Sequence, residues 1–361
     1  MNTLQTYGWD EVRTTEWASL ADTATRIPAR VVADFGSHYS VATPELLRAQ
    51  LSGVAAHKLE ATNMPKIGDW VAVEVTDGHT AIIHDVLSRT NEIIRGHVGR
   101  QLDKQVIAAN IDTAFVVQPL DHDFSPERLQ RYVFQLTSQS VDVVILLNKS
   151  DQCKNIEDKK EQLASLNAKT VTMSALHDED LSALNEFMTP GKTIVILGSS
   201  GAGKSTLTNR LLGEQRQKTQ VIRERDSKGR HTTVHRELFV LPSGGMIVDT
   251  PGIRELQLWG NERDLEATFD DVLAVIRQCH YSNCNHETED RCAVKPGLKD
   301  GTLDKTRYAT YMNFKKELQD LDTRRGFIEE RRTQQTKEAA KRHHKRSHRQ
   351  SLESERIELD S

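Results

Sequence analysis

A glycine-rich segment, GSSGAGKS at residues 198–205, has the spacing of a phosphate-binding loop. It follows the apolar run KTIVIL and opens the helical run STLTNRLLG, which is the strand–loop–helix context that this loop requires. Glycines let backbone N–H groups curl around phosphates, Lys204 reaches the outer phosphates, and Ser205 offers a hydroxyl oxygen to Mg²⁺. An ordinary Gly-Ser turn is the alternative, but the flanking strand and helix favour nucleotide binding.

A second segment, NKSD at residues 148–151, predicts which base is bound. Asp151 can accept hydrogen bonds from guanine N1 and N2, while Asn148 meets the opposite edge and the Lys149 stem packs over the base. After the next predicted strand, TMSAL at residues 172–176 places Ser174 and the Ala175 amide where they can contact guanine O6. Because adenine lacks the donors that Asp151 needs, the two segments predict GTP rather than ATP. A P-loop ATPase or kinase would require NKSD to be accidental.

A third segment, DTPG at residues 249–252, ends another apolar run and can sense the γ-phosphate. Asp249 can hold Mg²⁺ through water, and the Gly252 amide can meet the phosphate. In SKGRHTTVHREL, residues 227–238, Thr232 or Thr233 would complete the Mg²⁺ shell, and Thr233 is preferred of the two. An ordinary flexible loop is the alternative. The predicted magnesium ligands are therefore Ser205, Thr233 and Asp249. The predicted GTP-binding residues are Asn148, Lys149, Ser150, Asp151, Ser174, Ala175, Gly198, Ser199, Ser200, Gly201, Ala202, Gly203, Lys204, Ser205, Thr206, Asp249 and Gly252.

Three of the four cysteines and one histidine follow the spacing CxxxxCxHxxxxxC, as Cys279, Cys284, His286 and Cys292. Three thiolates and an imidazole make a closed tetrahedral Zn²⁺ site, which is structural rather than catalytic. Unpaired buried cysteines, or His280 in place of His286, are the alternatives. Three clustered cysteines would make an odd set for disulfides in an oxidising compartment. A metal site fits them better and indicates a reducing compartment.

The strands that must position these loops occur in an unusual order. Buried runs at 112–118, 141–148, 169–174 and 192–198 alternate with helical runs at 126–139 and 158–167, which predicts an α/β parallel sheet covered on both faces. ELFVLP and GMIVDT, joined by SGG, predict an antiparallel hairpin at the sheet edge. In the usual GTPase order these strands run fourth, fifth, sixth, first, second, third. The order predicts a circular permutation whose original ends are joined through residues 175–192.

The remaining segments predict two further domains and two tails. β-Rich runs between residues 29 and 95, with Val71, Val73 and Val75 on one face, predict a small closed barrel over 28–98. Residues 1–27 are expected to form a loosely attached arm, residues 99–262 the permuted GTPase domain, and residues 263–325 a helical zinc-binding domain. The tail at 326–361 is basic with an acidic end. Its basic run is either a solvated helix face or a contact to a phosphate backbone.

Overall composition gives little further indication of function. The formal charge is −4 with 28% charged residues, so bulk charge indicates no partner. No apolar run reaches the length of a membrane span, and the N-terminus lacks the pattern of a signal peptide. We therefore expect a cytosolic protein.

Over residues 28–320 the chain resembles the RsgA family, the circularly permuted GTPases dependent on the small ribosomal subunit, also called YjeQ or EngC. The resemblance lies in the permuted NKSD, SA, GSSGAGKS, GRHTT and DTPG segments followed by the Cys-Cys-His-Cys set. It implies an N-terminal OB-fold that binds rRNA, a GTPase domain and a zinc domain. It also implies a role in late maturation of the 30S subunit, with 16S rRNA as a partner and GTP hydrolysis stimulated by the subunit. A monomer is the simpler expectation for a ribosome partner.

One mechanistic expectation follows from the residue after DTPG. Ras-like GTPases carry a water-orienting glutamine there, but this chain carries Ile253, whose hydrocarbon cannot orient water. The family similarity suggests that His231 takes this catalytic role once the ribosome orders the loop, whereas the alternative is an exposed loop histidine. Ile253 also supports a second hypothesis, an RNA-binding assembly factor that holds guanine nucleotide with negligible hydrolysis.

Overall fold

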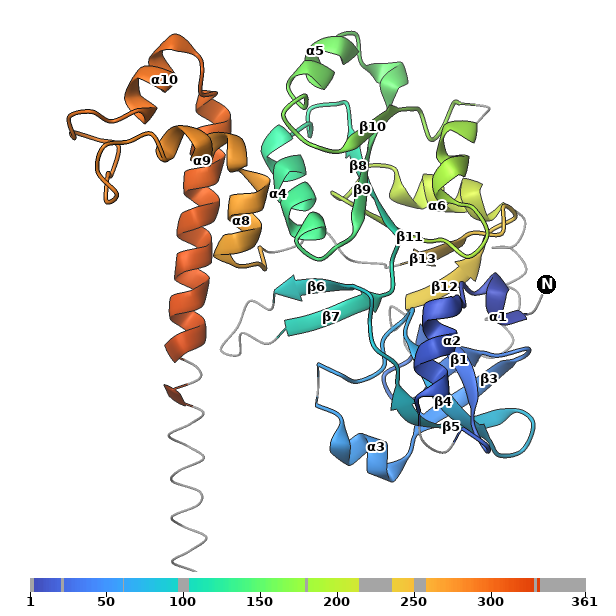
Figure 1. Ribbon diagram of the computed structural model, residues 1–361. Coiled ribbons are helices and arrows are strands. Elements are labelled where there is room, and N and C mark those ends of the chain that lie inside the picture. Colours follow the sequence, from blue (N-terminus) through green and yellow to red (C-terminus); the bar gives the residue numbers. More distant parts are fainter. Residues whose placement is uncertain are drawn as a thin grey trace, which may run out of the picture.

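The computed structural model of the chain describes residues 3–20, 23–60, 62–96, 104–178, 181–213, 236–249, 258–327 and 330–331. Figure 1 shows three parts: a β-barrel near the N-terminus, a central α/β domain and a C-terminal group of helices beside α4.

The N-terminal part is a closed barrel. It consists of β1 (Ile27–Asp34), β2 (Tyr39–Ala42), β3 (Leu46–Leu51), β4 (Trp70–Val75) and β5 (Thr80–Val86). Their order is β1-β2-β3-β5-β4, and β4 pairs back onto β1 and closes the barrel. β3 and β5 run parallel, and helix α3 (Gly53–Lys58) connects β3 to β4. This is the five-stranded arrangement of an OB-fold. Val71 and Val73 are fully buried in its core, as their alternation predicts, whereas Val75, at the end of β4, is 40% exposed.

The central sheet contains the parallel strands β8 (Thr113–Pro119), β9 (Asp142–Asn148), β10 (Lys169–Thr172), β11 (Thr193–Gly198) and β13 (Met246–Asp249), with β12 (Arg236–Val240) antiparallel to β13. Their spatial order is β10-β9-β8-β11-β13-β12. The strand that leads into the glycine-rich loop, β11, therefore lies between β8, which precedes it in the chain, and β13, which follows it. The predicted circular permutation is confirmed by this order.

Helices cover both faces of the sheet because its strands are apolar on both sides. On one face α4 (Pro126–Thr137) packs against Ala114 and Val116 of β8 in one hydrophobic cluster, and α5 (Ile156–Glu161) lies beyond it. On the other face Phe115 and Val117 pack with α6 (Lys204–Leu212) and the 3₁₀ turn η2 (Ser182–Phe187). A second 3₁₀ turn, η1 (Ser150–Gln152), follows β9. These layers hold the strand ends in fixed positions.

Two connections between the barrel and the sheet were not predicted. β6 (Glu92–Gly96) and β7 (Lys104–Ala109) form a separate two-stranded sheet across the expected domain boundary at residue 98. The hairpin strand β12 was expected at the sheet edge, and this expectation was wrong. The side of β12 that faces away from β13 pairs with β1 through Ala33–Glu237 and Asp34–Arg236. This pairing joins the barrel and the central sheet into one sheet of eleven strands. An edge strand carries unpaired N–H and C=O groups, and the barrel supplies partners for them.

The C-terminal part is helical, as predicted. It comprises α8 (Glu262–Thr268), α9 (Asp270–Ile276), α10 (Val294–Asp300) and a long helix at residues 305–327. Phe134 of α4 lies in the same hydrophobic cluster as Phe269 and Phe314, so this part packs on α4, which covers one face of the central sheet (Figure 1). Within the described ranges, no helix combines the length and apolar character needed to cross a membrane.

The N-terminal segment differs from the loosely attached arm that we expected. It forms α1 (Thr3–Thr6) and α2 (Glu11–Ala18), and Arg13 is only 5% exposed. The Arg13 guanidinium donates to Thr90 Oγ1 at 2.7 Å, to Asn110 Oδ1 at 2.8 Å and to the Ser88 carbonyl. Two further contacts hold the segment: the Ser88 N–H donates to Glu16 Oε1 at 2.6 Å, and the Trp9 ring packs edge-on against Trp70 with centroids 4.9 Å apart. Residue patterns assign a charged residue on a short helix to the surface, so they do not predict this attachment.

Replacing Arg13 by alanine should destabilise the barrel, because the Ser88 carbonyl, Thr90 Oγ1 and Asn110 Oδ1 would lose the donors that the buried guanidinium supplies. We expect a loss of about 2–4 kcal/mol, seen as a lower urea midpoint in tryptophan fluorescence. The control is Arg277→Ala, which removes an ion pair whose side chains are 62% and 73% exposed; it should cost roughly 0.5 kcal/mol or less. Equal midpoints for the two variants would show that α2 is not anchored.

Candidate nucleotide-binding site

The three predicted nucleotide-binding segments in the described chain meet at one edge of the central sheet. Asn148 ends β9, Gly198 ends β11, and Ser174 comes two residues after β10. Strand register aligns these ends, since Pro119 pairs with Asn148 and Val117 pairs with Gly198. Ligands of open α/β sheets bind outside the carboxyl ends of the strands, so this edge is the place for a nucleotide.

The glycine-rich loop is shaped by close backbone approaches that only glycine permits. Gly198 has φ +138°, and a Cβ there would lie 2.2 Å from the Val117 carbonyl oxygen. Gly203 has φ +98°, and a Cβ there would lie 2.2 Å from Asn148 Nδ2. The Lys204 ammonium donates to the carbonyls of Gly198 at 2.8 Å and Ser199 at 2.5 Å. The lysine therefore lies within the curve of the loop, at the start of α6.

The Asn148 side chain joins all three segments. It is 3% exposed, its Nδ2 donates to the Ala202 carbonyl at 2.7 Å, and its Oδ1 accepts the Ala175 N–H at 2.7 Å. A buried amide that loses such partners is costly, so these bonds fix the three loops relative to one another. We had expected Asn148 to meet the edge of the base. In the structure its amide connects protein segments. Besides these two hydrogen bonds, Asn148 Nδ2 has one more N–H to donate and Oδ1 has one more lone pair to accept.

Asp151 and Ser174 form a contact between the two segments that were predicted to read the base. Ser174 Oγ donates to Asp151 Oδ1 at 2.6 Å, and the Ser150 N–H donates to the Met173 carbonyl at 3.2 Å. The Ser174 hydrogen bond lowers the pKa of Asp151, so its carboxylate is ionised at neutral pH. An ionised carboxylate at this position can accept two N–H groups from a planar base.

Three residues that contact this site were not identified from the sequence: Asp121, Asp123 and Arg210. Lys149, in a left-handed backbone conformation with φ +61°, pairs with Asp121 at 2.8 Å. Ser199 Oγ donates to Asp123 Oδ2 at 2.6 Å. Arg210 of α6 donates to the carbonyls of Ala175, at 3.1 Å, and of Asp178. The signal for the two aspartates was their position after β8, at the same sheet edge as the other segments.

The predicted magnesium ligands are described only in part. Ser205 lies in the first turn of α6, and Asp249 is the last residue of β13, next to β11 in the sheet. Thr233, with its alternative Thr232, lies outside the described residues. So do His231, Gly252 and Ile253.

The predicted metal ligands are brought together in the C-terminal part. The ligand atoms of Cys279, Cys284, His286 and Cys292 all lie within 4.8 Å of one another. His286 Nδ1 is 3.6 Å from both Cys279 Sγ and Cys292 Sγ. Tetrahedral zinc with Zn–S near 2.3 Å and Zn–N near 2.05 Å separates S and N by about 3.6 Å. This donor set can therefore hold a metal ion, and it contains His286 rather than His280.

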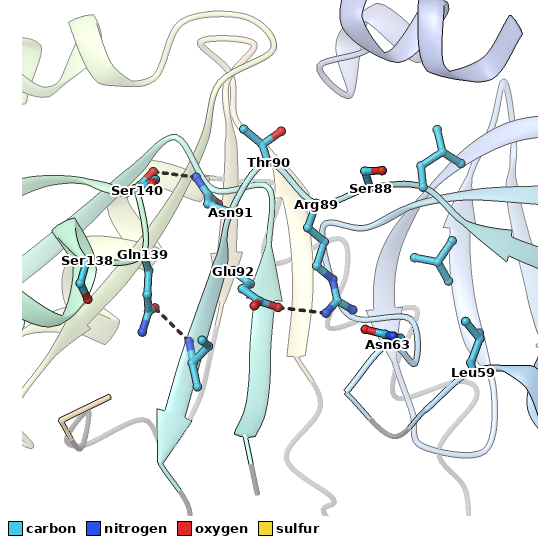
Figure 2. A pocket seen from close by; sticks show the side chains of 13 residues that line it. Leu59, Asn63, Ser88, Arg89, Thr90, Asn91, Glu92, Ser138, Gln139 and Ser140 are labelled. Atoms are coloured by element: carbon cyan, nitrogen blue, oxygen red, sulfur yellow. Dashed lines mark hydrogen bonds and ion pairs between the residues drawn. The ribbon is translucent and has the colours of Figure 1, made fainter. Parts of the chain in front are cut away.

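A cavity elsewhere in the molecule is a poor candidate for a catalytic site. It has a volume of about 580 Å³ and lies where the barrel, β6 and the end of α4 meet (Figure 2). Its cation, Arg89, uses all of its N–H donors on Asp69, Glu92 and the carbonyls of Thr62 and Met64. Asp69 is fully buried, so this group is a structural ion pair.

The sheet order and the loops at its edge define a class of protein, the circularly permuted P-loop GTPases. The family model described as RsgA GTPase matches residues 86–259. Two curated relatives are each named small ribosomal subunit biogenesis GTPase RsgA. The relative from Opitutus terrae is 39% identical over 332 residues, which are 87% of this chain and 89% of the relative. The relative from Xanthomonas axonopodis pv. citri is 41% identical over 332 residues, covering 88% of each chain. The chain belongs to the RsgA GTPase family.

Two solved structures share the fold of this chain. YjeQ from Thermotoga maritima has a TM-score of 0.59 and 25% identity, and the match covers 81% of this chain and 98% of that chain. YloQ, described as a circularly permuted GTPase, has a TM-score of 0.58 at 22% identity, covering 83% of this chain and 98% of that chain, and shows the shared fold.

Replacing Gly203 by alanine should disrupt nucleotide binding, because its Cβ would displace the Asn148 amide. We expect GDP affinity, measured by calorimetry, to fall about 30-fold or more, since a strained φ alone costs about 1–3 kcal/mol. Gly213→Ala is a matched control. Gly213 also has a positive φ, +52°, but a Cβ there would meet no neighbouring atom of the described residues within 4 Å. Similar affinities in the two variants would contradict the role given to Asn148.

Proposed function

We propose that this chain binds GTP, hydrolyses it to GDP and phosphate, and thereby assists late maturation of the small ribosomal subunit. The observation that carries this proposal is the Asn148 amide, which connects the base-reading and phosphate-binding segments in one site. Membership of the RsgA family supplies the activity and the cellular process.

We assign the nucleotide contacts by segment. The loop from Gly198 to Thr206 surrounds the phosphates, and Lys149 with Asp151 reads guanine. Ser174 and Ala175 lie beside the base. Asp249 and Gly252 sense the γ-phosphate. Mg²⁺, supplied with the nucleotide, would neutralise phosphate charge, and Ser205, Thr233 and Asp249 would hold it.

His231 is our proposed catalytic residue. Ile253 stands where Ras-like GTPases carry a water-orienting side chain, so another group must orient the attacking water. An imidazole in GRHTT has the chemistry for this role. The same isoleucine favours a second candidate function, a guanine-nucleotide-gated RNA-binding assembly factor with negligible hydrolysis.

The proposed partner is the 30S subunit with its 16S rRNA. The barrel over 28–98 would contact RNA, the GTPase domain would span 99–262, and the zinc-binding domain 263–325. The basic run of the tail at 326–361 would either contact the phosphate backbone of RNA or form a helix whose charged face is solvated. We further propose that the protein acts in the cytoplasm as a monomer.

GTP turnover with and without purified 30S subunits tests the proposed function. We expect subunits to raise turnover of GTP but not of ATP. His231→Ala should keep GDP affinity while losing about 100-fold or more of the stimulated rate, the usual effect of removing a group that positions or deprotonates a nucleophile. Unchanged stimulation in this variant would eliminate the role of His231. Turnover that stays negligible with subunits would favour the RNA-binding alternative.

Base selectivity provides an internal control for the same assay. Asp151→Asn replaces an acceptor of two N–H groups with an amide that donates on one side, so preference should shift from guanine toward xanthine nucleotides. A variant that still prefers guanine would contradict the assignment of Asp151.

We also propose that the cysteine–histidine cluster binds one structural Zn²⁺. The purified protein should contain about one zinc per chain by elemental analysis, and Cys284→Ser should lose it. Loss of a structural zinc removes about 10–16 kcal/mol of folding free energy from a small domain, so residues 263–325 should become sensitive to protease. Cys153→Ser is the control and should retain zinc, because Cys153 lies outside the cluster. Full zinc content in Cys284→Ser would contradict the assignment.

A further inference from the structure

The loop at residues 120–124, between β8 and α4, contacts both nucleotide-binding motifs. Asp121 Oδ2 accepts a hydrogen bond at 2.8 Å from Nζ of Lys149, a residue of the proposed base-reading segment. Asp123 Oδ2 accepts one from Ser199 Oγ at 2.6 Å, which lies in the glycine-rich loop. Two carboxylates separated by one residue therefore each hold one side of the site.

The first half of this loop is fixed to the strand that carries the base-reading segment. The Leu120 N–H donates to the Asn148 carbonyl at 2.8 Å. Asp121 Oδ1 accepts the Asp123 N–H at 2.9 Å, so both oxygens of Asp121 are engaged. The position of Asp121 is thus set by the backbone, and Asp121 in turn orients Lys149.

The second half is held by α4 and β8. Arg128 binds the two oxygens of Asp123 at 3.0 and 2.9 Å, a bidentate pairing that fixes the carboxylate plane. Gln118, 2% exposed, donates to the Asp123 carbonyl at 2.9 Å and accepts from Arg128 at 3.2 Å. Asp123 is therefore held in place independently of Ser199.

Both aspartates are ionised at neutral pH. The Ser199 hydrogen bond and then Arg128 lower the pKa of Asp123. Burial raises the pKa of Asp121, but hydrogen bonds from Lys149 and the Asp123 N–H outweigh it, and the net shift is downward. A carboxylate that contacted the nucleotide directly would repel its phosphates. Asp121 and Asp123 therefore serve the site indirectly, through the Lys149 and Ser199 side chains that they hold.

We propose that Asp121 and Asp123 are positioning residues that align the two halves of the guanine-nucleotide site, Asp121 through Lys149 and Asp123 through Ser199. The inference rests on the proposed nucleotide-binding function and assigns each aspartate a different half of the ligand. Asp123 acts on the phosphate half, and Asp121 acts on the base half.

Calorimetric affinities for GDP and GMP separate these roles. Asp123→Ala should weaken GDP about tenfold and GMP much less, because the phosphate loop mainly contacts the second phosphate. Asp121→Ala should weaken GDP and GMP by the same factor, because both ligands carry the base that Lys149 covers. A purely structural defect in Asp123→Ala would instead lower the GDP and GMP affinities by the same factor.

A double-mutant cycle tests the link between Asp123 and Ser199 directly. Ser199→Ala should reproduce the loss of GDP affinity seen in Asp123→Ala, and the double variant should lose little more. Asp123→Asn keeps an acceptor for Ser199 and should retain most of the affinity. Glu186→Ala, which removes an exposed ion pair with Lys169 in the same domain, is the control and should bind like the unaltered protein.

The outcomes separate this inference from the proposed function. Failure of the unaltered protein to bind GDP would contradict the proposed function itself. Normal binding by the unaltered protein, combined with additive losses in the cycle or an unchanged GDP:GMP ratio in Asp123→Ala, would overturn only the positioning role. If Asp123→Ala fails to fold, Ser199→Ala and Asp123→Asn measure the same link.

Discussion

The arrangement of the site depends on one buried amide. Asn148 bonds to Ala175, 27 positions later, and to Ala202, 54 positions later, and it is almost inaccessible to solvent. Because an unpaired polar group at such a place costs far more than a net hydrogen bond contributes, the three loops share one geometry. Gly203 is part of the same constraint, since only a residue without Cβ lets the glycine-rich loop approach this amide.

Circular permutation changes what the nucleotide-sensing segments are attached to. The β12–β13 hairpin ends in Asp249, and the helical C-terminal part with its metal-ligand cluster follows within the same stretch of chain. On its other side the hairpin pairs with barrel strand β1. The strand pair that ends at Asp249, the first residue of the proposed γ-phosphate segment, is therefore connected to both flanking parts, to one by hydrogen bonds and to the other by the covalent chain.

Sequence reasoning succeeded where a local pattern has a local cause and failed where a single distant contact decides the outcome. The strands of the central sheet, the barrel face with Val71 and Val73, and the spacing of the four metal ligands follow from periodicity and residue type. The burial of Arg13 was missed because a short polar helix has no strong hydrophobic period from which to predict a buried face. Its guanidinium instead finds three acceptors in segments that are distant in the chain. The barrel–sheet junction was missed because β1 and β12 lie far apart in the chain.

The sequence by itself determined the family, the permuted order of the strands and the positions of the motifs proposed to bind nucleotide and metal, because each requires particular residue types at short spacing. Only the tertiary structure decided which side chains hold those motifs in place: Asn148 between three loops, Asp121 on Lys149, and Asp123 on Ser199. Hydrogen bonds of this kind depend on distances of a few ångströms between residues that are remote in the chain. No local pattern records such distances, so packing of the sheet and its helices must bring these groups together first.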